Sequence, residues 1–184
     1  MFVINIIIAL VIFLTSALMS WTNGIDITLG NYLWLPMGAK ILAFLLFGLW
    51  ALPGVLLGSL MSGYILYNFL NVDPIYGPLG SLIGAFAPMI AILIMRYFDL
   101  STFFDSDKKL EFSHVIFLII LSSIINTLLK LFLYFGRVNG VDQQQIDSSE
   151  FILSYLTGDI LGGIVFILLT IKIFMPLLIR FKLI

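Results

Sequence analysis

The sequence predicts an all-α, polytopic membrane bundle of about six transmembrane helices. Of its 184 residues, 61% are hydrophobic and only 10% are charged, and the mean hydropathy is +1.17. A soluble domain of this length cannot bury so much apolar surface. The apolar residues form long continuous runs, not the short alternating segments of a membrane β-barrel. Helices are therefore expected, because they satisfy their own backbone hydrogen bonds within lipid.

The first three predicted spans lie close together in the N-terminal part of the chain. Each has close to the ~20 apolar residues that cross the hydrocarbon core of a bilayer. The first is Phe2–Ser20, and a polar loop follows it. The second is Pro36–Trp50, where Pro36 suits the first turn of a helix. A tight turn at residues 51–54 then leads into the third span, Pro53–Leu70.

The last three spans are separated by longer polar loops. The fourth is Leu79–Phe98, with a kink expected at Pro88 because proline cannot donate a backbone hydrogen bond. The fifth is His114–Phe135. The sixth begins near Glu150 and ends at about Pro176, leaving residues 176–184 as an expected interfacial tail. No second domain is evident, so residues 1–184 are expected to form a single membrane domain.

Glycines and serines recur four residues apart in three of these spans. The rows are Gly54, Gly58 and Ser62, then Gly80 and Gly84, then Gly158 and Gly162. Small residues at this spacing let helices approach closely. We expect them to pack helices within one monomer; contact with a second molecule is the alternative.

The basic residues predict the orientation of the bundle. They gather in the loop between the fourth and fifth spans and at the C-terminal end: Arg96, Lys108, Lys109, Lys172, Arg180 and Lys182. With six spans these two regions face the same side, which the positive-inside rule makes cytoplasmic. Both termini are then expected to be cytoplasmic in a multi-pass protein of a bacterial inner membrane.

Three charged residues lie within the apolar runs: Lys40, Lys130 and Asp159. A charge at the centre of a bilayer costs roughly 2.5–3.5 kcal/mol on insertion scales, so such residues usually form pairs or serve a site. Counting from the predicted helix ends at 1.5 Å per residue, all three fall in the outer half of the membrane.

Further polar residues are expected near these charges. Asn126 shares a helix face with Lys130, and Tyr64 and Tyr67 of the third span lie at a similar height. The predicted ligand-binding residues are Lys40, Tyr64, Tyr67, Asn126, Lys130 and Asp159. One alternative is a buried salt bridge from Asp159 to Lys40 or Lys130 that only stabilises the bundle. The others are a site where the second lysine meets an anionic ligand, and ion coupling through Asp159.

Several other classes of function are not expected. The chain has no cysteine and a single histidine, His114, at the cytoplasmic start of the fifth span, far from Asp159. No nucleophile triad, phosphate-binding loop or metal-ligand spacing is present in the sequence. No basic cluster indicates nucleic-acid binding. We therefore expect neither catalysis nor a cofactor or metal.

Short motifs resemble two families of membrane proteins. The stretch Trp34–Gly38, then Phe47-Gly48, Leu52–Gly54 and Gly58, together with the later Gly158–Gly162 segment, resembles membrane-associated sensor domains of the first (MASE-type) class. That family implies a membrane sensor domain that precedes a signalling module. Because the sequence ends at Ile184 without such an output domain, the resemblance implies a stand-alone sensor that signals through a separate partner protein.

The glycine-rich stretch from Phe47 to Gly58, with Leu29–Asn31, also resembles the substrate-binding S-components of energy-coupling-factor transporters. That family implies capture of a small solute, such as a vitamin, in an outward pocket and its delivery to a transport partner. The expected function is thus that of a membrane sensor-type domain, which binds a small, possibly anionic, molecule near the outer face and signals through a partner protein. The alternatives are a substrate-binding subunit of an uptake transporter for a vitamin or other small solute, and a membrane scaffold without catalysis.

Overall fold

The computed structural model describes residues 1–23, 31–66, 76–100, 112–135 and 148–180. Within these ranges the chain is all-helical. The helices are α1 (Phe2–Asn23), α2 (Leu35–Phe47), α3 (Leu52–Met61), α5 (Tyr76–Tyr97), α6 (Phe112–Phe135) and α7 (Ser148–Arg180), with a 3-10 helix at Gly48–Ala51 and a π-helical turn at Ser62–Leu66. The predicted helical class is confirmed.

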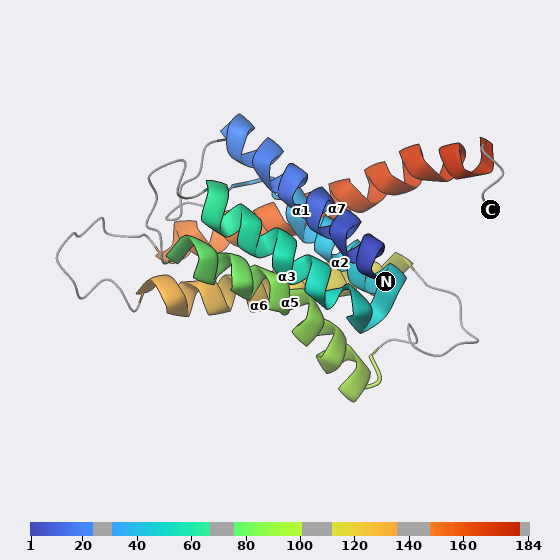
Figure 1. Ribbon diagram of the computed structural model, residues 1–184. Coiled ribbons are helices and arrows are strands. Elements are labelled where there is room, and N and C mark those ends of the chain that lie inside the picture. The colour runs from blue at the N-terminus through green and yellow to red at the C-terminus, as the bar shows by residue number, and fades with distance from the viewer. Residues whose placement is uncertain (24–30, 67–75, 101–111, 136–147, 181–184) are drawn as a thin grey trace.

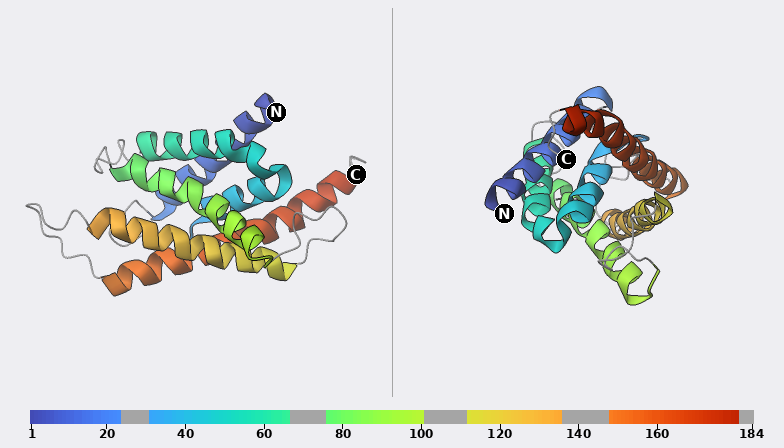
Figure 2. Two further views of the ribbon diagram at one scale, coloured as in Figure 1. Left: turned by 90° about the horizontal axis from the view of Figure 1, so that it is seen from below. Right: turned by 90° about the vertical axis from the view of Figure 1, so that its right-hand side faces the viewer.

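Five helical runs are long and apolar enough to cross a membrane: Phe2–Thr22, Leu35–Leu66, Tyr76–Tyr97, Phe112–Tyr134 and Ser148–Ile173. The second run contains both α2 and α3. As a straight helix it would be about 48 Å long, well beyond the ~30 Å hydrocarbon thickness. It does not stay straight, because the chain folds back after α2 and α3 returns along the bundle (Figures 1 and 2).

The fold-back begins at Gly48. Its φ of 58° and ψ of −148° define a backbone conformation that is essentially restricted to glycine. The Gly48 N–H still donates to the Phe44 carbonyl, which ends α2 at Phe47. The sequence predicts this turn at residues 51–54 and a helix that continues to Trp50. That placement is wrong by three residues, because Pro53 occupies the first turn of α3 and does not form the turn itself.

The end of the last helix also differs from the prediction. The sequence predicts that this helix ends at about Pro176, but α7 continues to Arg180. A proline inside a helix removes one backbone hydrogen bond, and the surrounding apolar sequence retains the rest. The helix α5 likewise contains Pro88 within its length, and the kink expected there stays a prediction. The final residues of the third predicted span, 67–70, and residues 181–184 lie outside the described ranges.

Glycines set the closest helix contacts. A Cβ added to Gly54 would lie 2.6 Å from the Asn5 carbonyl oxygen, and one added to Gly58 would lie 2.7 Å from that of Ala9, so α3 packs directly on α1. The Asn5 side-chain oxygen also accepts a hydrogen bond of 2.8 Å from the Gly54 N–H. Gly38 brings α2 against Gly163 of α7 in the same way. The expectation that small residues pack the monomer is confirmed at these contacts.

Gly158 and Gly162 accommodate a different partner. A Cβ at either position would collide with the backbone of the segment that precedes α2, at Asn31 and Trp34 respectively. The Trp34 N–H donates a 2.9 Å hydrogen bond to the Gly158 carbonyl. The entry to α2 is thereby fixed across the N-terminal half of α7, one residue from Asp159.

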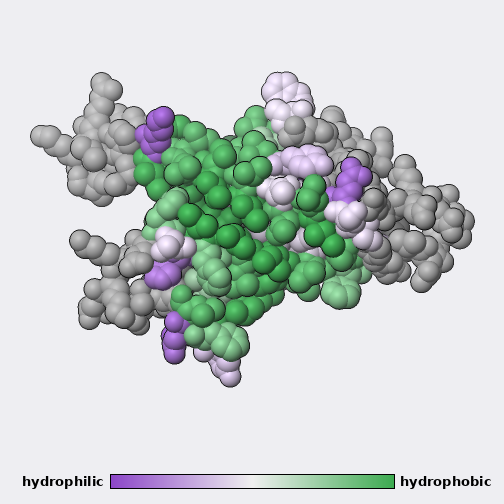
Figure 3. Space-filling view, turned by 180° about the vertical axis from the view of Figure 1, so that it is seen from behind, coloured by the Kyte–Doolittle hydropathy of each residue, from purple (hydrophilic) through white to green (hydrophobic). Residues whose placement is uncertain are grey.

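Polarity is distributed as in a protein surrounded by lipid. Large apolar residues of α1, α6 and α7 are exposed, whereas lysine, asparagine, aspartate and several serines are buried. Figure 3 shows hydrophobic residues across the middle of one face and hydrophilic residues toward its two ends. Both the start of α1 and the end of α7 lie toward the same end of the bundle (Figures 1 and 2). The end of α6 that carries Lys130 and the N-terminal half of α7 that carries Asp159 lie toward the other end.

Candidate ligand-binding site

The centre of the site is a hydrogen bond between α6 and α7. The Asn126 Nδ2 donates to Asp159 Oδ2 at 2.5 Å, and the two side chains are 1% and 2% exposed. Hydrogen bonds to a carboxylate are shorter and stronger than neutral ones. Asp159 is positioned by α7, where Gly158 fixes the preceding turn against the segment before α2.

Lys130 lies one helical turn beyond Asn126 on the same face of α6. Its side chain is buried, and its Nζ lies 4.7 Å from the centroid of the Tyr155 ring on α7. Tyr155 belongs to a buried aromatic cluster with Tyr134 and Phe151. A cation over an aromatic face is attracted to the ring, so this cluster holds the lysine stem while its ammonium extends toward α5.

Lys40 reaches the same region from α2 and is only 5% exposed. A Cβ built on Gly84 of α5 would lie 3.1 Å from Lys40 Nζ and 3.5 Å from Asn126 Oδ1. Lys40 Nζ and Asn126 Oδ1 therefore both lie against Gly84.

The buried salt bridge considered from the sequence does not form among the described residues. The carboxylate of Asp159 is engaged by the Asn126 amide, and neither lysine makes a direct ion pair with it. Two cations thus influence one anion from beyond contact distance. The sequence places these residues at one height in the membrane. It does not reveal that the Asn126 amide donates a hydrogen bond to the Asp159 carboxylate.

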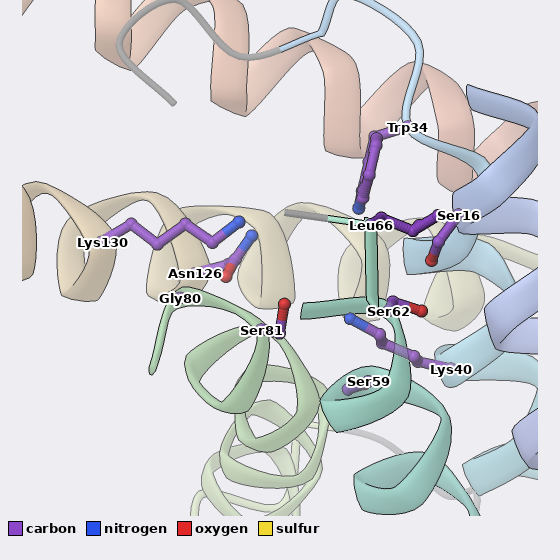
Figure 4. A pocket seen from close by; sticks show the side chains of 10 residues that line it. All are labelled: Ser16, Trp34, Lys40, Ser59, Ser62, Leu66, Gly80, Ser81, Asn126 and Lys130. Carbon is purple, nitrogen blue, oxygen red and sulfur yellow. The ribbon is translucent and has the colours of Figure 1, made fainter. Parts of the chain in front are cut away.

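A cavity separates the two lysines. It is a small, partly open hollow: about 390 Å³ of space between the surrounding atoms includes open solvent, and the enclosed part has room for about one water molecule. Figure 4 shows Lys130 and Lys40 extending toward it from opposite sides. Its lining is mostly polar or small: Ser16, Trp34, Lys40, Ser59, Ser62, Leu66, Gly80, Ser81, Asn126 and Lys130.

Two atoms of the lining have unused hydrogen-bonding capacity. Within the described ranges, Ser59 Oγ and Asn126 Oδ1 are buried and have no hydrogen-bond partner. Ser16 and Ser62, in contrast, donate to backbone carbonyls of their own helices at 2.7 Å. A buried polar group without a partner costs roughly 1–3 kcal/mol, so these atoms are expected to meet water or a ligand.

The cavity contains some of the predicted site residues and adds others. Lys40, Asn126 and Lys130 line it, and Asp159 supports Asn126 from behind. Tyr64 is 64% exposed and does not line the cavity; Tyr67 lies outside the described residues. Sequence reasoning missed the serines of α1 and α3. Ser59 and Ser62, three residues apart in an apolar helix, were an available signal.

Two further observations limit the chemistry of the described residues. No group of three His, Cys, Asp or Glu side chains in those ranges lies close enough to hold a metal ion. His114 lies in the first turn of α6, whereas Lys130 lies near the other end of that helix. His114 is therefore remote from the region of Lys130 and Asp159.

Comparisons with known proteins provide no identification. No family model, curated protein or solved structure matches this chain. Any functional proposal therefore depends on the geometry and charge of the cavity.

Proposed function

We propose that this protein binds a small anionic molecule between Lys40 and Lys130 and acts through a separate partner protein, without catalysing a reaction. The observation that carries the proposal is the pair of buried lysines that extend into one polar cavity while the neighbouring carboxylate is engaged by Asn126. A bound carboxylate or phosphate would place negative charge beside two desolvated cations that have no anionic side chain in direct contact within the described ranges.

The Ser59 hydroxyl favours the same class of ligand. It lies in the lining beside Lys40, is 1% exposed and has no partner in the described part of the chain. A hydroxyl can donate to an anion. The ligand would therefore be held by two ammonium groups and at least one neutral donor.

The orientation of the protein forms part of the proposal. We propose six membrane crossings, with α2 and α3 as two short arms and both termini in the cytoplasm of a bacterial cell. The clustering of lysine and arginine in residues 96–109 and 172–182 supports this orientation. The cavity then opens toward the outer face, since it lies at the end of the bundle away from the termini.

The first choice of biological role is a membrane sensor domain that signals through its partner. The second is a capture subunit of an uptake transporter. One observation favours the second role: Trp34, in the described residues 31–34 that lead into α2, lines the cavity and would lie beside a captured solute. A scaffold without a ligand is the remaining alternative. Isolation of the partner from membranes separates the three, because an ATPase-coupled protein supports uptake and a signalling protein supports sensing.

Binding is tested by calorimetry on the detergent-solubilised protein, using sodium succinate, sodium propionate and inorganic phosphate as probes. Lys40→Met and Lys130→Met are each expected to reduce binding at least tenfold, since each removes a charged hydrogen bond worth ~1.5–3 kcal/mol. Lys172→Met is the matched control, because Lys172 is an exposed lysine of α7 remote from the cavity. Undiminished binding in both cavity variants, or no binding of any probe to the wild-type protein, would reject the proposal.

A smaller change examines the serine. Ser59→Ala should weaken binding without reducing thermal stability, because the hydroxyl has no partner to lose. Ser122→Ala is its control: Ser122 Oγ is also buried and unpartnered within the described residues but does not line the cavity. Equal binding by the two variants would remove Ser59 from the site.

A further inference from the structure

Asn126 imposes a second requirement on the ligand, beyond its negative charge. An amide side chain has one group that donates and one that accepts. In this protein one of the two amide hydrogens is used, because Nδ2 donates to Asp159 Oδ2. The side chain cannot rotate to exchange its nitrogen and oxygen without turning the oxygen toward the carboxylate. Asp159 therefore fixes which end of the Asn126 amide is the oxygen, and within the described ranges that oxygen has no donor.

That oxygen is buried and lacks a donor. Asn126 is 1% exposed, lines the cavity, and within the described ranges its Oδ1 has no hydrogen-bond partner. The oxygen lies 3.5 Å from the position that a Cβ of Gly84 would occupy, and Lys40 Nζ lies 3.1 Å from the same point. One ligand can thus reach both groups: its anionic oxygen at a lysine and a donor at Asn126.

We infer that the site selects an anion that also carries a hydroxyl or amine hydrogen, such as a hydroxy acid, over the same anion without that donor. This inference rests on the proposed function and names the class of its ligand. A carboxylate and a phosphate ester are both compatible with the two lysines. The donor requirement is independent of which anion is present.

Gly84 allows Lys40 to approach α5 closely. The Lys40 Nζ can lie where it does because this position of α5 has no side chain. A methyl group there would displace the flexible end of Lys40 but would meet no helix backbone within 4 Å. Gly84→Ala should therefore fold normally and lose the preference for donor-bearing anions together with much of the binding.

The test compares matched pairs of probes that differ in a hydroxyl: malate with succinate, lactate with propionate, and glycerol 3-phosphate with propyl phosphate. In the wild-type protein at least one hydroxylated member should bind about tenfold or more tightly than its partner, because a site built around a polar group strongly rejects an analogue that leaves the group unpaired. The same pairs separate carboxylate from phosphate ligands.

Two variants assign the preference to Asn126. Asn126→Leu should abolish the preference, whereas Thr127→Val should retain it, since Thr127 is the adjacent buried residue and does not line the cavity. If Asn126→Leu fails to fold because Asp159 loses its partner, the double variant with Asn126→Leu and Asp159→Leu removes donor and acceptor together and leaves both lysines in place. It should bind both members of a pair equally.

The outcomes separate the two proposals. Equal wild-type affinity for both members of every pair would overturn the donor requirement and leave anion binding intact. Absence of binding by all six probes would overturn both. A preference that persists in the leucine variants would assign it to another residue and contradict the inference.

Discussion

Replacing Asp159 by asparagine removes one charge from the cavity wall while preserving its shape. The amide oxygen of the substituted side chain can still accept the hydrogen bond that Asn126 donates to the native carboxylate. The change in stability therefore measures the charge alone. Lys130 and Lys40 are buried in the same region of the bundle, and among the described residues neither makes a direct ion pair with Asp159.

The expected magnitude follows from Coulomb's law. At an effective dielectric constant of about 20, unit charges roughly 6–10 Å apart interact by about 2–3 kcal/mol. A neutral asparagine avoids the desolvation cost of a buried carboxylate, which offsets part of the lost attraction. We therefore expect a net destabilisation of about 2 kcal/mol. For a chain of this size that corresponds to a decrease in melting temperature of about 4–8 °C.

A double-mutant cycle tests the physical cause. In a Lys130→Met background, Asp159→Asn should cost at least about 1 kcal/mol less than in the wild type. A Lys172→Met background should leave the cost unchanged, because Lys172 lies about 20 Å along α7 from Asp159. The assay is unfolding in detergent, followed by the fluorescence of the tryptophans. Additivity between Asp159→Asn and Lys130→Met would refute the reasoning.

Three further predictions concern the architecture around the cavity. Gly158→Ala should destabilise the protein by about 3 kcal/mol, because the new Cβ meets the rigid backbone at Asn31. Gly84→Ala should leave the free energy of unfolding within about 0.5 kcal/mol of the wild type, since the new Cβ meets only side-chain atoms. Similar thermal unfolding curves for the two variants would contradict this. Asn5→Ala should cost about 1–3 kcal/mol by leaving the Gly54 N–H without its acceptor, and Asn5→Asp should restore most of the loss because it keeps that oxygen; no rescue would show that the hydrogen bond is not responsible. Gly48→Ala should cost about 1–3 kcal/mol through backbone strain alone, since no atom lies within 4 Å of the added Cβ, and Gly48→Asn should be no better tolerated; a neutral Gly48→Ala would argue against the fold-back.

The helices could be predicted because their signals are local. Continuous apolar runs place α1, α5 and α6 within a few residues of their observed ends. The turn after α2 was less accessible. Gly48 and Pro53 are both turn-forming residues, and only the backbone angles identify Gly48 as the one that reverses the chain.

The site could be predicted only in part. An intramembrane charge is conspicuous in sequence, so Lys40, Lys130 and Asp159 were recognisable, and helix counting placed them at one height. Their partners depend on helix rotation, which the apolar pattern specifies poorly when every face is hydrophobic. For that reason sequence reasoning could consider a lysine for Asp159, while the structure provides Asn126. It also included Tyr64, which faces outward.

The most direct test of anion binding is native mass spectrometry of the protein released from its own membranes. The account predicts a bound small molecule that carries at least one acidic group and is retained by Lys172→Met. The same molecule should be absent from Lys40→Met and from Lys130→Met, provided both variants are folded. An adduct that persists in both lysine variants, or a wild-type protein that carries only lipid, would contradict the account.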